Sequence, residues 1–130
     1  MRLKRFLPSL LLLVSYQTQA TTYYVNAAAS GTNTGLNWAN AFTDPQVALS
    51  IAIPGDEVWV AAGQYKPTAT TSRTVSFVLR NGVNVYGGFA GTETSLAQRD
   101  IASNPTVLNG DIGALGDNTE GARSVAYNLG

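Results

Sequence analysis

The stretch Val58-Trp59-Val60-Ala61-Ala62-Gly63 decides the fold, because its pattern recurs twice further along the chain. The pattern is a short aliphatic strand that ends in glycine. A second copy is Val83-Asn84-Val85-Tyr86-Gly87-Gly88, and a degraded third copy is Pro105-Thr106-Val107-Leu108-Asn109-Gly110. The copies begin 25 and then 22 residues apart. Repeats of this length are typical of solenoids, in which each unit stacks its apolar face on the next.

Alignment of the copies makes two sets of residues equivalent, inward aliphatics and turn glycines: Val60, Val85 and Val107, and Gly63, Gly88 and Gly110. A further extended segment at residues 74–79 and a turn at Asn81-Gly82 lie between copies. One such circuit per copy predicts one coil of a parallel β-helix. The alternative is an antiparallel sandwich or barrel, whose strands usually recur every 8–12 residues.

A β-branched and aromatic strand at residues 21–26, then a small, polar loop at residues 27–37, precede the repeats. One short helix is predicted next, because Asp44 is a good N-cap and Pro45 suits the first helical position. Pro54-Gly55 ends it. Four residues at helical spacing are expected to share its buried face: Val47, Ala48, Ile51 and Ala52.

The first 20 residues have the order of a secretory signal peptide. Arg2, Lys4 and Arg5 are basic, residues 7–14 are mostly apolar, and Thr18-Gln19-Ala20 places small residues at a cleavage site. The apolar run is shorter than the roughly 20 residues of a membrane span, so cleavage after Ala20 is favoured over an uncleaved anchor.

The remaining residues, 21–130, carry five Lys and Arg against eight Asp and Glu, a net charge of −3. This acidic balance disfavours nucleic acid and anionic membranes as partners. The chain has no cysteine and no histidine. Disulfides, Ser-His-Asp and Cys-His sites, and zinc sites built on His or Cys are therefore excluded.

The carboxylates suggest turn chemistry more than catalysis. Asp56-Glu57 is an adjacent pair, and neighbours on a strand point to opposite faces. Asp111, Asp117 and Glu120 lie in a Gly-rich segment that could supply oxygens to calcium, but their spacing fits neither an EF-hand nor a nonapeptide calcium repeat. No metal, cofactor-binding or catalytic residue is therefore assigned.

Basic and aromatic side chains are the remaining candidates for a binding surface. Four of the five basic residues of the mature chain are the candidates, and surface solubility explains them best: Lys66, Arg73, Arg80 and Arg99. Trp59 and Tyr86 are expected to point outward if the flanking valines point inward. There they could stack on sugars or pack under the Thr-rich loop at residues 68–74, and packing is favoured.

Several stretches resemble the N-terminal cap and first coil of bacterial pectin-lyase-like right-handed parallel β-helix surface proteins, which include proteins similar to polymorphic outer membrane proteins. The resemblance is carried by these segments: Tyr23-Tyr24-Val25, Asn37-Trp38-Ala39-Asn40-Ala41-Phe42, and residues 55–67, 85–95, 99–100 and 104–112. It implies an all-β fold, namely the first coils of a right-handed parallel β-helix with an N-terminal amphipathic capping helix. Members of the family are usually several times longer, so it also implies a truncated copy.

These observations predict four regions: a signal peptide (1–20), a strand, loop and capping helix (21–57), β-helix coils (58–118) and a poorly defined C-terminal end (119–130). The expected function is that of an exported, non-catalytic, adhesin-like module at the cell surface, the outer membrane or outside the cell. The alternative is a fragment of a polysaccharide-degrading enzyme of the same group. Surface glycans or other surface proteins are the expected partners, together with self-association through the open C-terminal coil.

Overall fold

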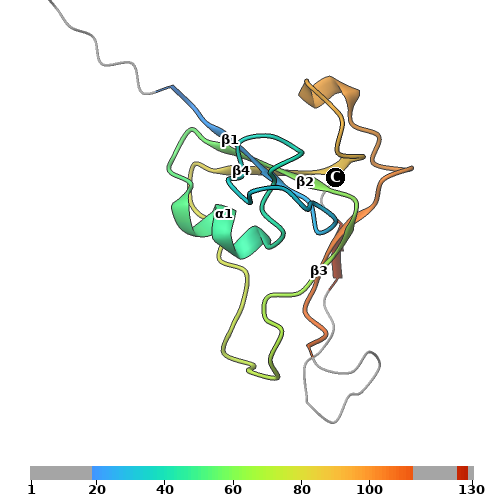
Figure 1. Ribbon diagram of the computed structural model, residues 1–130. Helices are drawn as coiled ribbons and strands as arrows, with labels where there is room; N and C mark the ends of the chain where they lie inside the picture. The colour runs from blue at the N-terminus through green and yellow to red at the C-terminus, as the bar shows by residue number, and fades with distance from the viewer. Residues whose placement is uncertain (1–18, 113–125, 129–130) are drawn as a thin grey trace, which may run out of the picture.

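A computed structural model describes residues 19–112 and 126–128 of the chain (Figure 1). In this part of the chain the first sheet has three strands in the order β1-β2-β4: β1 (Thr22–Val25), β2 (Glu57–Ala61) and β4 (Asn84–Phe89). Both pairings are parallel. Parallel neighbours need a long connection to return the chain to the same end of the sheet. The segments 26–56 and 62–83 provide these returns.

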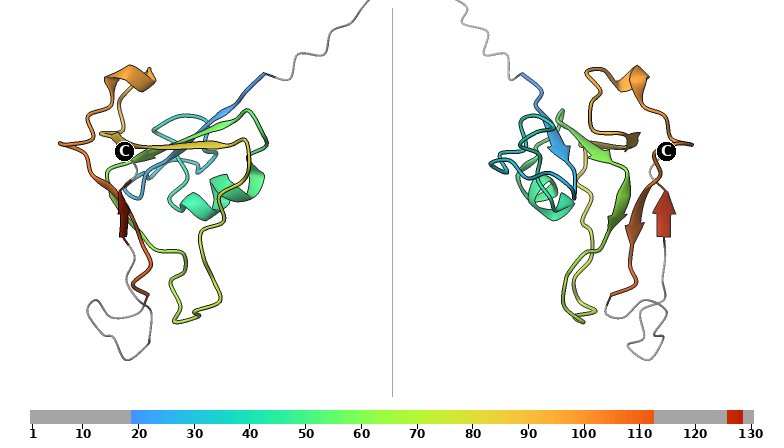
Figure 2. Two further views of the ribbon diagram at one scale, coloured as in Figure 1. Left: turned by 180° about the vertical axis from the view of Figure 1, so that it is seen from behind. Right: turned by 45° about the vertical axis from the view of Figure 1, so that its right-hand side comes forward.

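The second sheet runs across the end of the first (Figure 2). It contains β3 (Gly63–Tyr65), β5 (Thr106–Asn109) and β6 (Ala126–Asn128), with β5 in the middle. β3 and β5 are parallel, whereas β6 is antiparallel to β5. Only Ala62 separates β2 from β3, so the chain turns a sharp corner there and contributes to both sheets.

The register of the first sheet aligns residues of like character in two rows: Tyr23, Val58 and Val85, and Tyr24, Trp59 and Tyr86. Successive residues of a strand point to opposite faces, so the two rows lie on opposite sides of the sheet. The first row contacts the hydrophobic core, in which Val58 is fully buried. The core consists of Val25, Phe42, Ala48, Ala52, Val58, Val60, Tyr65, Val83 and Leu108.

The opposite face of the sheet is covered by aromatic side chains. We call Tyr24, Trp38, Trp59 and Phe89 the outer aromatic cluster. The rings of Trp59 and Phe89 are stacked with centroids 4.8 Å apart, and those of Tyr24 and Trp38 meet edge to face at 4.9 Å. Phe89 is fully buried. Because aromatic pairs add about 0.5–1.5 kcal/mol each beyond their buried area, this face contributes to stability as the core does.

The predicted helix is present as α1 (Pro45–Ile51), with Asp44 as its N-cap and Pro45 in its first turn. Oδ1 of Asp44 accepts a hydrogen bond from the Gln46 amide at 2.8 Å. The predicted buried face is only partly correct. Ala48 and Ala52 are buried, but Val47 and Ile51 remain 39% and 46% exposed, and the helix buries Pro45 and Leu49 in their place.

The alignment of the repeats needs two corrections. Val85 pairs with Val58 and not with Val60, and β4 contains an extra residue where it passes from Tyr86 to Phe89 beside β2. This β-bulge shifts the register, since two residues of one strand then oppose one of the other. Val107 lies in the second sheet, paired with Gln64 of β3, so the third copy does not stack on the second. Residues 74–79 belong to neither sheet.

The predicted parallel strands and the one short helix are thus confirmed. The antiparallel alternative is wrong for three pairings: β1 with β2, β2 with β4, and β3 with β5. The architecture of residues 19–112 and 126–128 is small and mixed, and no solenoid is assigned within it. The proposed leader lies outside the described residues except for Gln19 and Ala20. Most of the predicted C-terminal end, 119–130, also lies outside them.

The bulge places Gly88 where a side chain cannot fit. Its φ is +86°, and a Cβ there would lie 2.8 Å from Cγ1 and 3.0 Å from Cα of Ile101. Gly55 has a similar φ of +97° but no neighbouring atom within 4 Å of its virtual Cβ. We expect Gly55→Ala to lower the free energy of unfolding by about 1–2 kcal/mol through backbone strain alone.

Gly88→Ala should lower that free energy by about 1–3 kcal/mol more, because it adds the clash with Ile101 to the strain. Urea denaturation of the purified chain and both variants measures the difference. Equal losses in the two variants would contradict the close packing at the bulge.

Candidate functional site

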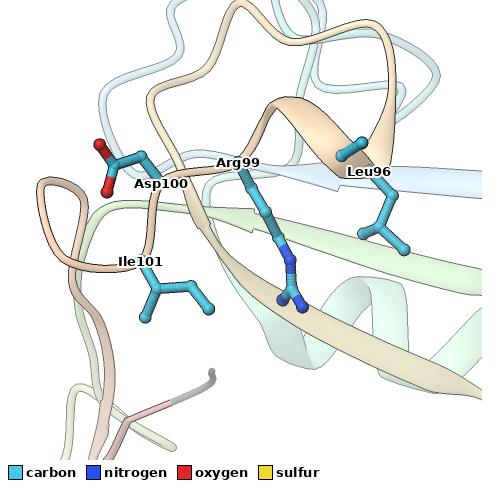
Figure 3. A pocket seen from close by; sticks show the side chains of 5 residues that line it. Leu96, Arg99, Asp100 and Ile101 are labelled. Atoms are coloured by element: carbon cyan, nitrogen blue, oxygen red, sulfur yellow. The ribbon is translucent and has the colours of Figure 1, made fainter.

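An open hollow lies beside the 3-10 helix η1 (Leu96–Gln98) (Figure 3). Its lining residues are Leu96, Ala97, Arg99, Asp100 and Ile101. Oε1 of Gln98 accepts hydrogen bonds from the amides of Thr94 at 2.7 Å and Ser95 at 3.1 Å, which holds the start of η1. The hollow therefore has a locally ordered wall with one cation and one anion.

Arg99 and Asp100 do not face one another (Figure 3). The Arg99 guanidinium lies 5.1 Å from the ring centroid of Tyr86, and its Nη1 donates to the Gly87 carbonyl at 3.4 Å. Asp100 accepts from the amide of Ser103 at 3.1 Å and from its hydroxyl at 2.9 Å. Both charges are thus engaged in holding the backbone, and the hollow contains no acid–base pair.

The hydrogen bonds from Ser103, first from its amide and then from its hydroxyl, hold the pKa of the Asp100 carboxyl below its ordinary value. Because a hydrogen-bonded carboxylate favours its charged form, Asp100 stays ionised at neutral pH. A general acid must keep its proton near the working pH, so Asp100 is unsuited to that role. It acts as the side-chain acceptor of the turn at residues 100–103.

Neither predicted sugar-stacking aromatic has its ring free. Trp59 is buried, contrary to an exposed outward position, and stacks on Phe89. Tyr86 is half-buried, and the Arg99 guanidinium covers one face of its ring. Packing is therefore supported over binding, but the partners differ from the predicted Thr-rich loop at residues 68–74: Phe89 and Tyr24 pack on Trp59, and Arg99 packs on Tyr86. The alternation of residues along β2 predicts that Trp59 lies on the face opposite the valines. It does not predict which rings cover that face.

The adjacent carboxylates have separate structural roles. Asp56 is buried, and its two oxygens accept from the amides of Thr21 at 2.9 Å and Ile53 at 3.0 Å. Glu57 is half-buried and accepts from Nε1 of Trp59 at 2.8 Å. They do not form a shared site, as strand alternation predicts, and the turn role expected of Asp56 agrees with these bonds.

The calcium hypothesis lies mainly outside the described residues, because Asp117 and Glu120 belong to the part that the structure does not describe. Asp111 is half-buried, and its amide donates to Oδ1 of Asn109 at 2.9 Å. Within residues 19–112 and 126–128, no three Asp or Glu side chains gather where a metal ion could bind. The calcium hypothesis therefore gains no support from this part of the chain.

The basic residues are spread over the surface. Arg73 and Arg80 are exposed on the long segment before β4, and Lys66 is half-buried just after β3. Arg99 is the only one of the four that lines the hollow. Hydrolysis of glycosides by paired carboxylates needs two such groups flanking one bond. Four of the described carboxylates accept from backbone amides instead: Asp44, Asp56, Glu93 and Asp100.

Comparison with protein families, with curated proteins and with solved structures finds no match for this chain. In the described part of the chain, no helix has the length and apolar character to cross a membrane.

Glu93 is a buried functional carboxylate that the sequence analysis did not single out. Its oxygens accept from the amides of Ala90, Gly91 and Thr92, the last two at 3.0 and 3.1 Å, and its backbone carbonyl accepts from Nε1 of Trp38 at 2.8 Å. Glu93 therefore ties the turn after β4 to the outer aromatic cluster. A carboxylate two residues after Gly91 is the only signal of this role in the sequence.

Burial acts to raise the pKa of the Glu93 carboxyl, but hydrogen bonds from backbone amides outweigh it and hold the pKa below its ordinary value: those of Ala90, Glu93 itself, Gly91 and Thr92. A carboxyl with a depressed pKa in the folded state stabilises the fold fully above its unfolded pKa. That contribution is lost as the pH falls through the folded pKa. Acid should therefore loosen this turn.

We expect Glu93→Gln to lower the free energy of unfolding by about 1–2 kcal/mol at neutral pH, because a neutral oxygen accepts the three amides less strongly. The difference from the natural chain should shrink as the pH is lowered to about 3, below the reference pKa of Glu. Urea denaturation over this range measures it, with Glu57→Gln as the matched control. Parallel pH profiles for the natural chain and Glu93→Gln would contradict this role of the carboxylate.

Proposed function

We propose that this chain is an exported, non-catalytic module that forms the capped first coils of a right-handed parallel β-helix at a bacterial surface. The observation that carries the proposal is the stack of parallel strands in which β2 lies between β1 and β4. A β-helix grows by adding such strands, one rung for each coil. The corner from β2 into β3, which pairs in parallel with β5, supports the same interpretation.

The two edges of the first sheet support a direction of growth. The β1 edge is covered, since the amide of Phe42 donates to the Tyr24 carbonyl at 2.9 Å and the amide of Tyr24 donates to the Gly35 carbonyl at 2.8 Å. The α1 helix follows directly and buries Ala48 and Ala52 in the core. A covered end of this kind prevents strand pairing at the start of a solenoid.

A non-catalytic role is supported by the use of the described polar groups. Asp56, Glu93 and Asp100 bind backbone amides, and Arg99 lies over Tyr86. Each of these groups holds a turn or a strand end, which suits a scaffold that displays its loops. The exposed connection at residues 68–76 and the turn after β4 are the surfaces that such a module would offer to glycans or other surface proteins.

Export is the first part of this proposal to test. In a bacterial host, the full chain should reach the cell exterior or envelope without its leader. Leu11→Arg combined with Leu12→Arg should keep it in the cytoplasm at full length, because the charges interrupt the apolar run. Cell fractionation with intact-mass measurement detects both outcomes. Leu36→Arg, at a side chain that is 61% exposed, is the matched control. Cytoplasmic retention of the natural chain would contradict the proposal.

Self-association through β4 is the second part of the proposal to test. Within the described residues no strand pairs with the outer edge of β4. We expect the exported chain to associate as its concentration rises. Asn84→Arg should weaken this, because Asn84 is an exposed residue of β4 and the charge would lie at the open end of the stack. Light scattering over a concentration series measures the effect, and Val78→Arg, 66% exposed in the preceding loop, is the control. A monomer at all concentrations, or equal effects of both variants, would contradict association at this edge.

A further inference from the structure

The backbone nitrogen of Thr21 is held by a buried carboxylate. Oδ1 of Asp56 accepts from it at 2.9 Å, and Asp56 is only 3% exposed. The carbonyl of Thr21 accepts from the Glu57 amide at 3.0 Å, so Thr21 is fixed on both sides of its Cα. The other oxygen of Asp56 binds the Ile53 amide at 3.0 Å, just after α1. One carboxylate thus joins the start of β1 to the end of the helix.

The chain changes its surroundings at the same bond. Gln19 and Ala20 are exposed and belong to no helix or strand, whereas Thr21 is half-buried. The small-residue pattern Thr18-Gln19-Ala20 predicts leader cleavage after Ala20. Cleavage there converts the Thr21 amide, by hydrolysis of the Ala20–Thr21 peptide bond, into an α-ammonium group. The atom that becomes charged is the Thr21 nitrogen, which already donates a hydrogen bond to Asp56.

We propose that Asp56 is the receptor for the processed N-terminus, and that leader removal creates a buried ion pair between the Thr21 α-ammonium and the Asp56 carboxylate. The inference rests on the proposed export and adds a processing site and a role for Asp56. An amide donates one hydrogen bond and carries no charge. An ammonium carries a full charge and three donors, and charge-assisted hydrogen bonds are about twice as strong as neutral ones.

The pair stabilises a specific part of the fold. The Asp56 carbonyl accepts from the Asn84 amide at 3.2 Å, at the start of β4. Thr21, Asp56 and Asn84 therefore lie at the start of the three strands of the first sheet. A chain that still carries its leader has the same hydrogen bond without the ammonium charge. Processing therefore strengthens the stack at its first rung, after export.

The test uses the secreted full chain, processed by the host, in four forms. Two serines inserted between Ala20 and Thr21 move the new α-ammonium away from Thr21 by at most about 7 Å. The insertion is made in the natural chain and in Asp56→Asn. We expect the natural product to begin at Thr21 by intact mass. The insertion should lower its thermal midpoint by about 4 °C, and should have little effect in the Asp56→Asn background.

Glu57→Gln is the control background, because Glu57 accepts from Trp59 and not from Thr21. There the insertion should lower the midpoint as much as in the natural chain. If Asp56→Asn does not fold, selective acetylation of the α-amino group of the natural product replaces it, and should reproduce the effect of the insertion.

The outcomes are distinguishable. A chain that stays unprocessed overturns both export and the inference. A processed chain that begins at another residue overturns the inference alone. A product that begins at Thr21 overturns the ion pair if the insertion has the same effect in Asp56→Asn as in the natural chain, or if acetylation leaves the midpoint unchanged.

Discussion

The parallel pairing of β2 with both β1 and β4 is the constraint on which the rest of the structure depends. Once this register is set, side-chain alternation assigns Val58 and Val60 to one face and Trp59 to the other. A three-stranded sheet with apolar residues on both faces needs other parts of the chain to shield each face from water. The chain meets this demand with α1 and β3 on the aliphatic side and with the outer aromatic cluster on the other. The long connections are therefore covering elements as well as crossovers.

The bulge in β4 links the two sheets. The extra residue in β4 brings Gly88 to the corner, where its amide donates to Oγ1 of Thr106 at 3.0 Å. The same hydroxyl donates to the Val60 carbonyl at 3.1 Å, and Thr106 is fully buried. One side chain thus accepts from a backbone amide of β4 and donates to a backbone carbonyl of β2. An unpaired buried amide costs about 1–3 kcal/mol, so a hydroxyl at this position is part of the fold.

Local chemistry made the helix predictable, whereas long-range packing did not follow from the sequence. Asp44 and Pro45 act within a few residues of themselves, and their roles at the start of α1 are confirmed. The periodicity of the helix is compatible with more than one apolar stripe, and the fold buries Leu49 while Val47 and Ile51 stay exposed. In the same way, the repeats predicted parallel stacking correctly. A single added residue at the bulge then shifted the equivalence of Val60 and Val85 and turned the third copy into the other sheet. Of the candidate residues, the separate roles of Asp56 and Glu57 followed from strand alternation. The amide contacts of Asp56 and Glu93 join backbone that no spacing rule connects to them.

The ends of the two sheets impose different conditions on any further strand. In the first sheet, the outer edge of β4 pairs with no strand of the described chain, so a parallel rung could be added along its first residues. Near the end of β4 the Gly88 carbonyl already accepts from the Asp100 amide at 2.9 Å. In the second sheet, β5 already has β3 on one side and the antiparallel β6 on the other. A strand has two edges, so a parallel rung on β5 requires β6 to leave. Continuation of both sheets as a regular coil and the pairing of β6 with β5 are therefore mutually exclusive. A chain that keeps β6 in place can therefore add a parallel rung beside β4 but not beside β5.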